Sequence, residues 1–355
     1  VTITVVRADE KEASKSWSFV VGKSRYQLYF GQLHSHTTYS DGSGSLDSAL
    51  DYVANLPDSA NVDFVAFTDH SNYFDTASNL GNFADASAGK LTADGTQTLW
   101  QEAKTTTAHY NSIVADKVFC YGFEMTWSGQ YGHMNIYNTV GFESRNNPDY
   151  VIKGGPGLTN FYNRLKQFPN ALGMFNHPGT TFGTFEDFAH WDPAIDSIVT
   201  MIEVGNGEGQ VGGGSYWPSY EYYTLALDKG WHVAPTNNQD NHKGKWGNAN
   251  TTRTVVLTDN FTEEGIYQAM RDRAIYSTED HNLEIMYTLN NMPMGSIIDA
   301  TDNVHIYASI SDPNASDVIG LVSVVVNGGV TVYTQEFNSN TGILDVTLPS
   351  DYSYY

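Results

Sequence analysis

Short apolar runs alternate with amphipathic segments from about residue 27 to residue 258 of the chain. Seven of the runs have the length and composition of strands, at residues 29–36, 62–70, 118–127, 171–177, 198–205, 231–237 and 254–257, and an eighth is expected near residues 134–139. Apolar residues recur at helical spacing in three intervening segments, 46–54, 158–168 and 266–270. This alternation predicts an α/β architecture.

Strands that are apolar on both faces and joined by helices form parallel sheets, and about seven such units can close into a barrel. We therefore predict a (β/α)7-like barrel over residues 27–282, preceded by a β segment at residues 1–26. Later strands at 284–289, 304–310, 321–326, 330–337 and 343–348 alternate apolar and polar residues, with a hairpin signal at Asn327-Gly328-Gly329. This pattern predicts a C-terminal β-sandwich module over residues 283–355. The ending Tyr354-Tyr355 resembles the start of another strand, which predicts that the module is cut short.

The chain is strongly acidic, with 40 Asp and Glu residues against 18 Lys and Arg residues and a formal net charge of -22. Tight binding to phosphate backbones needs clustered basic residues, and the sequence contains no basic block, so we expect no nucleic-acid partner. No apolar run is long enough to span a membrane, and no obligate protein partner is evident. The richness in Thr, Ser, Asn, Gly and Tyr predicts a secreted or cell-surface bacterial protein, with the cytoplasm as the alternative.

Histidine and carboxylate side chains follow nearly all of the predicted strands, at the ends where parallel barrels place their active sites. His34 and His36 project to the same side, because residues i and i+2 of a strand do so. Asp41 follows on a turn, and the second strand ends in Asp69 and His70. We interpret His70 as a ligand and Asp69 as an acceptor that orients a ligand histidine, with the reverse assignment left open. The other candidates at strand ends are Glu124, His133, His177, Asp240 and His242.

The candidate ligands, without Asp69, comprise six histidines and three carboxylates, a set that suits Zn, Mn or Fe and is too rich in nitrogen for calcium. The single cysteine, Cys120, excludes a cysteine-built site. Nine ligands are too many for one ion, whereas three divalent ions that share a bridging carboxylate and a bridging hydroxide would use them all. Multinuclear sites of this kind activate water and bind phosphoryl oxygens.

These residues and their order resemble the PHP family, the polymerase and histidinol phosphatase domain, and most closely its branch of CehA- and McbA-like carbaryl hydrolases. The resemblance covers residues 27–282 and implies a distorted (β/α)7 PHP-type barrel. It implies that one ion is held by His34, His36 and Asp240, and a second by Asp41, His70 and His242. His133 and His177 would hold the third, with Glu124 as the bridging carboxylate.

The resemblance implies a metal-dependent phosphoesterase, a phosphatase or phosphodiesterase that cleaves small phosphate esters with a metal-bound hydroxide. Asp240, Glu124 and His242 are the predicted catalytic residues, and Asp240 or a metal-bound water would protonate the leaving group. A carbamate or ester hydrolase of the carbaryl-hydrolase type is one alternative. A non-catalytic binding or surface protein is another, and a DNA exonuclease conflicts with the net charge.

Three basic residues near the last ligand pair, Lys243, Lys245 and Arg253, are predicted to bind the substrate. The alternative is that the two lysines are solvated loop charges. Trp127, Tyr73 and Trp246 lie near ligand loops, where they either form an aromatic wall for an organic substituent or pack in the core. Glu203 and Glu208 lie near the end of the fifth strand and are not assigned as ligands.

Overall fold

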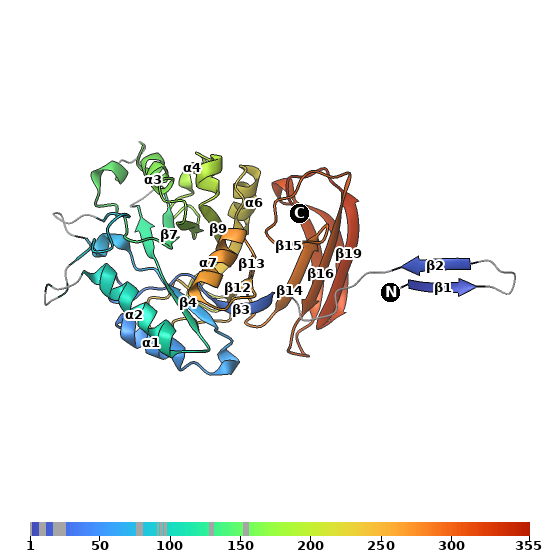
Figure 1. Ribbon diagram of the computed structural model, residues 1–355, viewed down its shortest axis with the longest axis horizontal. Coiled ribbons are helices and arrows are strands. Elements are labelled where there is room, and N and C mark those ends of the chain that lie inside the picture. Colours follow the sequence, from blue (N-terminus) through green and yellow to red (C-terminus); the bar gives the residue numbers. More distant parts are fainter. Residues whose placement is uncertain are drawn as a thin grey trace.

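The computed structural model describes residues 2–6, 12–16, 26–75, 81–90, 92, 95, 98–127, 131–151 and 156–355. Strands β1 (Thr2–Val6) and β2 (Glu12–Ser16) form an antiparallel pair. They fall within the N-terminal β segment, residues 1–26, whose assignment as a separate part of the chain stays a prediction and whose other residues up to 25 lie outside the described ones. In Figure 1 this pair lies beyond the C-terminal sheets. No helix among the described residues has the length and apolar character needed to cross a membrane.

Two sheets form the central part of the molecule. The first has five strands in the order β13 (Ile275–Thr278), β12 (Arg253–Thr258), β3 (Gln27–Gln32), β4 (Phe64–Phe67) and β5 (Val118–Tyr121). The second runs β10 (Trp217–Pro218), β9 (Val199–Asn206), β8 (Leu172–Asn176), β7 (His133–Tyr137) and β6 (Phe123–Thr126), and β11 (Ala234–Asn238) also pairs with β9.

The fold is mixed α/β, as predicted. The sequence predicts parallel strands, however, and several of the observed pairs are antiparallel. β7 is antiparallel to both β6 and β8, and β12 is antiparallel to β3. The connection from β6 to β7 is too short for a crossover helix, which leaves an antiparallel pairing as the available one. The predicted closed barrel is not found among the described strands, because no continuous hydrogen-bonded ladder joins the two sheets. Only isolated bridges, between His70 and Glu124 and between Ser35 and Asn241, link them.

Seven helices are described, and in Figure 1 they lie around the strands of the central part, with α1 and α2 side by side. Their bounds are α1 (Leu46–Ala54), α2 (Leu99–Ile113), α3 (Gly157–Leu165), α4 (Phe185–Phe188), α5 (Pro193–Asp196), α6 (Tyr220–Asp228) and α7 (Glu263–Asp272). The predicted helices correspond to α1, α3 and α7. In α1, the Ser45 hydroxyl caps the first turn and Leu46, Ala49, Leu50 and Val53 are buried, because residues at this spacing share one helix face.

The C-terminal part contains a four-stranded sheet and a two-stranded sheet that enclose a separate apolar cluster. The sheets comprise β15 (Met292–Pro293), β14 (Glu284–Leu289), β16 (Asn303–Ser311) and β19 (Thr341–Pro349) on one side, and β17 (Ile319–Val326) with β18 (Val330–Ser339) on the other. The predicted turn at Asn327–Gly329 joins β17 to β18. The strands have the alternating burial that the sequence predicts for a half-buried strand, as β16 shows.

Candidate metal centre

His34 and His36 lie immediately after β3 and are completely buried. Their Nε2 atoms are 3.1 Å apart, and each lies close to Oδ1 of Asp240, at 3.2 Å from His34 and 3.0 Å from His36. The spacing of one residue places both imidazoles on the same side of the strand end, as predicted. Two imidazole nitrogens, from His34 and His36, and one carboxylate oxygen, from Asp240, therefore converge on one point.

Glu124 on β6 is the centre of the cluster. Its carboxylate lies 3.4 Å from Nε2 of His34, 3.3 Å from Nδ1 of His133 and 3.4 Å from Nε2 of His177, and it forms an ion pair with His70. The side-chain amide of Asn176 donates a hydrogen bond of 2.8 Å to its Oε1. Because β7 runs antiparallel to β6, its first residue, His133, reaches the same edge as the end of β6. One carboxylate thus contacts donors from several strands.

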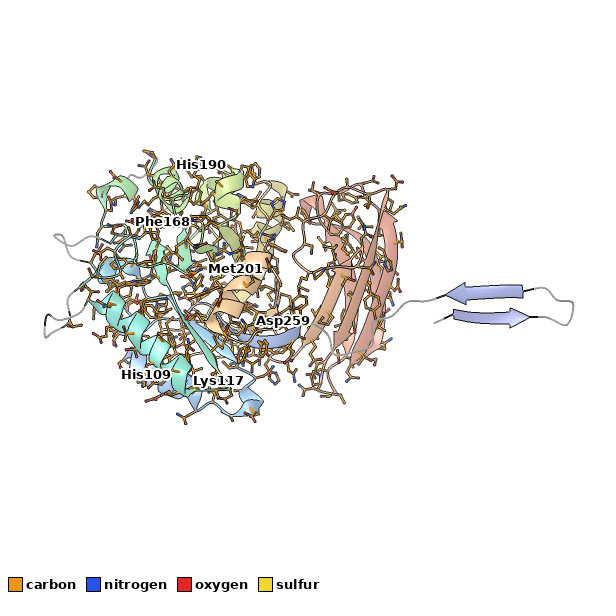
Figure 2. All side chains as sticks on the ribbon, viewed as in Figure 1. His109, Lys117, Phe168, His190, Met201 and Asp259 are labelled. Atoms are coloured by element: carbon orange, nitrogen blue, oxygen red, sulfur yellow. The ribbon has the colours of Figure 1, made fainter. Side chains whose placement is uncertain are left out.

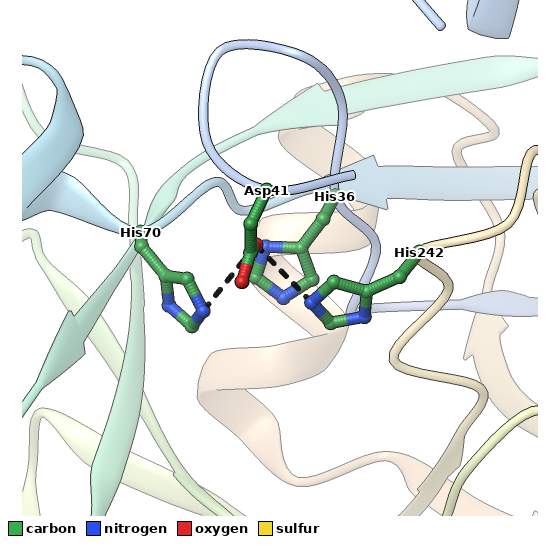
Figure 3. A group of neighbouring side chains, drawn as sticks. All are labelled: His36, Asp41, His70 and His242. Carbon is green, nitrogen blue, oxygen red and sulfur yellow. Dashed lines mark ion pairs between the residues drawn. The ribbon is translucent and has the colours of Figure 1, made fainter. Parts of the chain in front are cut away.

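A second group lies at the mouth of the site, where Asp41 stands between His70 and His242 (Figure 3). Oδ1 of Asp41 is 3.6 Å from Nε2 of His70 and 3.2 Å from Nε2 of His242. The ring of His36 stacks at 4.2 Å from that of His242 and lies 4.5 Å from that of His70. The Asp41 side chain is 43% exposed, so this group opens to solvent, whereas the His34 group does not.

Two of the predicted ligands have left-handed backbone conformations, with φ of 26° at His177 and 48° at Asp240. Such values are unfavourable for residues other than glycine and persist where the surrounding structure imposes them. The backbone N–H of His177 donates to Oε2 of Glu203, and the ring of His242 contacts the carbonyl of Asp240. These contacts hold the strained residues with their side chains in the cluster.

Opposite charges offset the burial of this cluster. Burial raises the pKa of Glu124, but His70, His133 and His34 outweigh it and hold that pKa well below its usual value. Burial lowers the pKa of His70, whereas Glu124 and Asp41 raise it to about 10. Glu124 is therefore ionised beside the charged imidazole of His70, whereas burial lowers the pKa of His36 and His133 and favours the neutral form that binds a cation.

Asp69 organises the loop that carries Asp41. Its carboxylate accepts hydrogen bonds from the backbone N–H of Thr37 at 2.7 Å, from the hydroxyl of Ser40 at 2.7 Å and from the hydroxyl of Tyr121 at 3.1 Å. Oγ of Ser40 lies 3.2 Å from Nδ1 of His36. Asp69 thus reaches a histidine through a serine hydroxyl rather than by direct contact.

Glu203 positions two histidines of the cluster, His34 and His177, by hydrogen bonds. This role was not assigned to Glu203 from the sequence. It is completely buried in β9, and its carboxylate contacts Nδ1 of His34 at 2.9 Å, the N–H of His177 at 2.7 Å and the side-chain amides of Asn206 at 2.9 Å and Asn238 at 3.0 Å. A carboxylate on the distal nitrogen fixes which nitrogen of an imidazole faces a metal. The available signal was an acidic residue within an otherwise largely apolar strand.

Arg253, one of the three predicted substrate-binding cations, does not lie at the centre. Its guanidinium is buried and donates to backbone carbonyls of Ala60, Asn61, Asn250 and Thr252, so its hydrogen-bonding capacity is used within the fold. This placement corrects the predicted substrate contact, because strand β12 turns the side chain towards the η1 helix (Asp58–Ala60).

The two predicted lysines lie on the loop after β11. Lys243 is 75% exposed, and its Nζ lies 3.2 Å from Oε2 of Glu208. Oε1 of Glu208 accepts hydrogen bonds from the backbone N–H groups of His242 and Lys243. Lys245 is exposed. The positive charge of Lys243 is therefore balanced locally, and its contact with a substrate stays a prediction.

The predicted aromatic wall is only partly present at the mouth. Trp127 and Trp246 are buried, and their indole N–H groups donate to the carbonyls of Tyr150 and His36, which places both rings in the core. Tyr73 is exposed and its ring is stacked 6.2 Å from that of His70. Phe182, which the sequence did not single out, is exposed beside His133 and His177. Five other histidines lie outside the cluster, among them His109 and His190, which Figure 2 shows at opposite margins of the molecule.

The donor set fits divalent cations. Three groups of ligand atoms each lie within 4.8 Å of one another: His36, Asp41, His70 and His242; His34, Glu124 and His177; and His34, His36 and Asp240. Oδ1 of Asp240 is buried and makes no hydrogen bond of standard geometry, although Nε2 of His36 lies 3.0 Å away. Buried polar atoms without partners are costly, and a cation among nitrogen and carboxylate donors would satisfy them.

Metal loading is expected to raise the unfolding temperature on the order of 5 °C at about 100 times the dissociation constant, because the cluster exists in the folded state. Calorimetric scans of chelator-treated protein with and without Zn or Mn would measure this shift. His36→Ala removes a donor from two of the three groups and should reduce the shift. An identical shift in this variant would place the bound metal elsewhere.

Comparison with known proteins gives likenesses of fold. No family model matches the chain, and no curated protein matches it. A two-domain protein from Bacteroides vulgatus, described as containing a predicted PHP-like metal-dependent phosphoesterase, is similar over 91% of this chain and 87% of that chain, with 15% identity and a TM-score of 0.46. The chain is similar to PHP-like structures. The PHP resemblance was expected from the sequence, whereas the CehA and McbA branch stays a prediction.

Two endonuclease structures are also similar, one of them described as lesion-specific. PfuEndoQ from Pyrococcus furiosus is similar over 71% of this chain and 58% of that chain, with 14% identity and a TM-score of 0.40. An Endonuclease Q solved with a 27-mer duplex that carries an abasic lesion at the active site is similar over 69% of this chain and 57% of that chain, with 11% identity and a TM-score of 0.38. The chain thus spans less than two thirds of either endonuclease.

The DNA-bound endonuclease contradicts the prediction of no nucleic-acid partner, which is corrected here. The prediction rested on a net charge of -22, which sums the charge over the whole surface. A phosphodiester is bound locally, by cations at the site, so an acidic surface elsewhere does not exclude a nucleic acid among the ligands of a PHP-like fold.

Proposed function

We propose that this chain is a metal-dependent hydrolase that cleaves phosphate esters at the His and carboxylate cluster around Glu124. The observation that carries the proposal is the contact of this one buried carboxylate with five imidazoles, those of His34, His36, His70, His133 and His177. Structural zinc sites use four ligands that close the coordination sphere. A cluster of nine donors that opens to solvent at Asp41 favours a catalytic site for several ions.

We assign three divalent ions to the cluster. His34, His36 and Asp240 would hold one ion, and Asp41, His70 and His242 a second. His133 and His177 would hold the third, with Glu124 between the ions. Divalent ions in such a site supply activated water and neutralise charge on phosphoryl oxygens. The distances from Glu124 to these histidines support the assignment.

The chain's own residues orient the reaction. His34 and His36 are fully buried and fix the inner end of the site, whereas Asp41 and His242 lie at its open end. Asp240 has a side chain that is 20% exposed, and its Oδ2 lies 3.9 Å from Nε2 of His177. We assign to Oδ2 of Asp240 a relay in which this ionised carboxylate accepts a proton from the attacking water and passes it to the leaving oxygen, because it contacts both the buried histidines and the mouth.

Hydrolysis of nitrophenyl phosphate, bis-nitrophenyl phosphate and nitrophenyl carbamate by Mn- or Zn-loaded protein tests the proposal. Turnover of at least one phosphate ester is expected, with a loss of roughly 100-fold or more in His34→Ala and Asp240→Ala. His109→Ala removes a histidine of α2 outside the cluster and should retain turnover. Turnover of the carbamate alone would replace the phosphoesterase proposal by a carbamate hydrolase, and no turnover would overturn both.

A further inference from the structure

Two exposed aromatic rings lie against the predicted ligand histidines at the mouth of the site. Phe182 is 43% exposed, and the centre of its ring is 4.8 Å from that of His133 and 4.7 Å from that of His177. Tyr73 is 38% exposed, and the centre of its ring is 6.2 Å from that of His70, on which it stacks. The ring of His70 in turn contacts that of His133. We call Phe182 and Tyr73 the aromatic rim.

The loop that carries Phe182 is held in one conformation. The backbone groups of Gly179 and Gly183 form two hydrogen bonds, from Gly179 N to Gly183 O at 3.0 Å and from Gly183 N to Gly179 O at 2.8 Å. Gly183 is also bridged to Tyr131. This tight loop directly follows His177, and its hydrogen bonds hold Phe182 against the His177 ring. A large apolar ring that is fixed and left open to solvent at a polar site is a typical ligand contact.

One cationic group lies beside the rim. Nζ of Lys90 lies 5.8 Å from the centre of the Tyr73 ring. In a chain with 18 basic residues, a cation at the aromatic rim favours an anionic ligand on this side of the mouth.

We infer that the aromatic rim binds the organic part of the phosphate ester and that this part carries a planar aromatic ring. The inference rests on the proposed function and narrows its substrate class from phosphate esters in general to ring-bearing ones. A ring bound at Phe182 would lie next to His133 and His177, which the Phe182 ring contacts. Stacking of this kind changes affinity by about tenfold when the aromatic side chain is removed.

Binding of phenylphosphonate and methylphosphonate to metal-loaded protein tests the inference without any turnover. Wild-type protein is expected to bind phenylphosphonate about tenfold more tightly, and Phe182→Ala should remove most of this preference. Phe182→Tyr should retain it and Phe182→Leu should not, because leucine supplies apolar area without a planar face. Metal content measured on each variant shows whether the ligand histidines are intact.

Trp191→Ala is the matched control, since Trp191 is a similarly exposed aromatic residue, 41% exposed, whose ring lies near Gly230 rather than on a histidine of the cluster. It should leave the preference for the phenyl compound unchanged. Equal affinity of wild-type protein for both phosphonates would overturn the inference, even in a protein that hydrolyses phosphate esters. A phenyl preference without hydrolysis of any phosphate ester would instead overturn the proposed function and retain the ring-binding rim.

Discussion

Replacement of Glu124 by glutamine is expected to lower turnover of phosphate esters by roughly 1,000-fold and to reduce the amount of bound metal. Glutamine keeps the shape of the side chain and the hydrogen bond with Asn176 but removes the charge. Histidines on several strands would then face a neutral amide. Metal analysis of the purified variant, together with initial rates at saturating metal, measures both effects.

Glu186→Gln provides the control for Glu124→Gln, because it also replaces a glutamate that contacts a histidine, His190, but at an exposed position of α4 outside the cluster. This variant should match the wild type in metal content and rate. Full metal content and full turnover in Glu124→Gln would contradict a central role for this carboxylate and, with it, the assignment of bridged ions.

Replacement of Glu203 by glutamine is expected to weaken metal binding by about 10- to 100-fold, although Glu203 is not a predicted ligand. The carboxylate fixes Nδ1 of His34 and the backbone of His177, and an amide cannot accept all four of its hydrogen bonds. The effect should appear as a higher metal concentration for half-maximal activity, with a smaller change in kcat at saturating metal. Calorimetric titration with Zn or Mn measures the affinity directly.

A purely structural role for Glu203 would lower stability without changing metal affinity. Asp196→Asn separates the two possibilities, because Asp196 is a buried carboxylate that holds His232, a histidine outside the cluster, through its N–H and its Nδ1. This control should be destabilised while its metal affinity stays at the wild-type level. Wild-type affinity in both variants would show that Glu203 does not position the donors.

The spacing of predicted ligands within one strand end could be read from the sequence because that signal is local. His34 and His36 are spaced for one side of a strand end, and Asp240 and His242 repeat that spacing. The predicted helix faces were also local, as the buried positions of α1 show. Each of these features depends on a few neighbouring residues, so the sequence alone was sufficient to predict them.

Features that depend on distant parts of the chain could not be predicted in the same way. The direction of β7 follows from pairing with β6 and β8, which apolar runs do not encode. Arg253 follows the ligands closely in sequence, but its guanidinium meets carbonyls some 190 residues earlier, with a separation of 192 from Asn61. Phe182 was missed because an aromatic residue in a polar loop has no signal until the loop packs on His177.

The bridge between Ser35 and Asn241 has a consequence for how the protein is made. The segments that carry the first and last predicted ligands meet there, and the backbone N–H of Leu33 donates to the side chain of Asn238, 205 residues further along the chain. While the ribosome synthesises the middle of the chain, His34 and His36 have already been made, but their carboxylate partner Asp240 has not. Such distant pairings form slowly, so the nascent chain passes through a period with half a chelating site exposed to the metals of its surroundings.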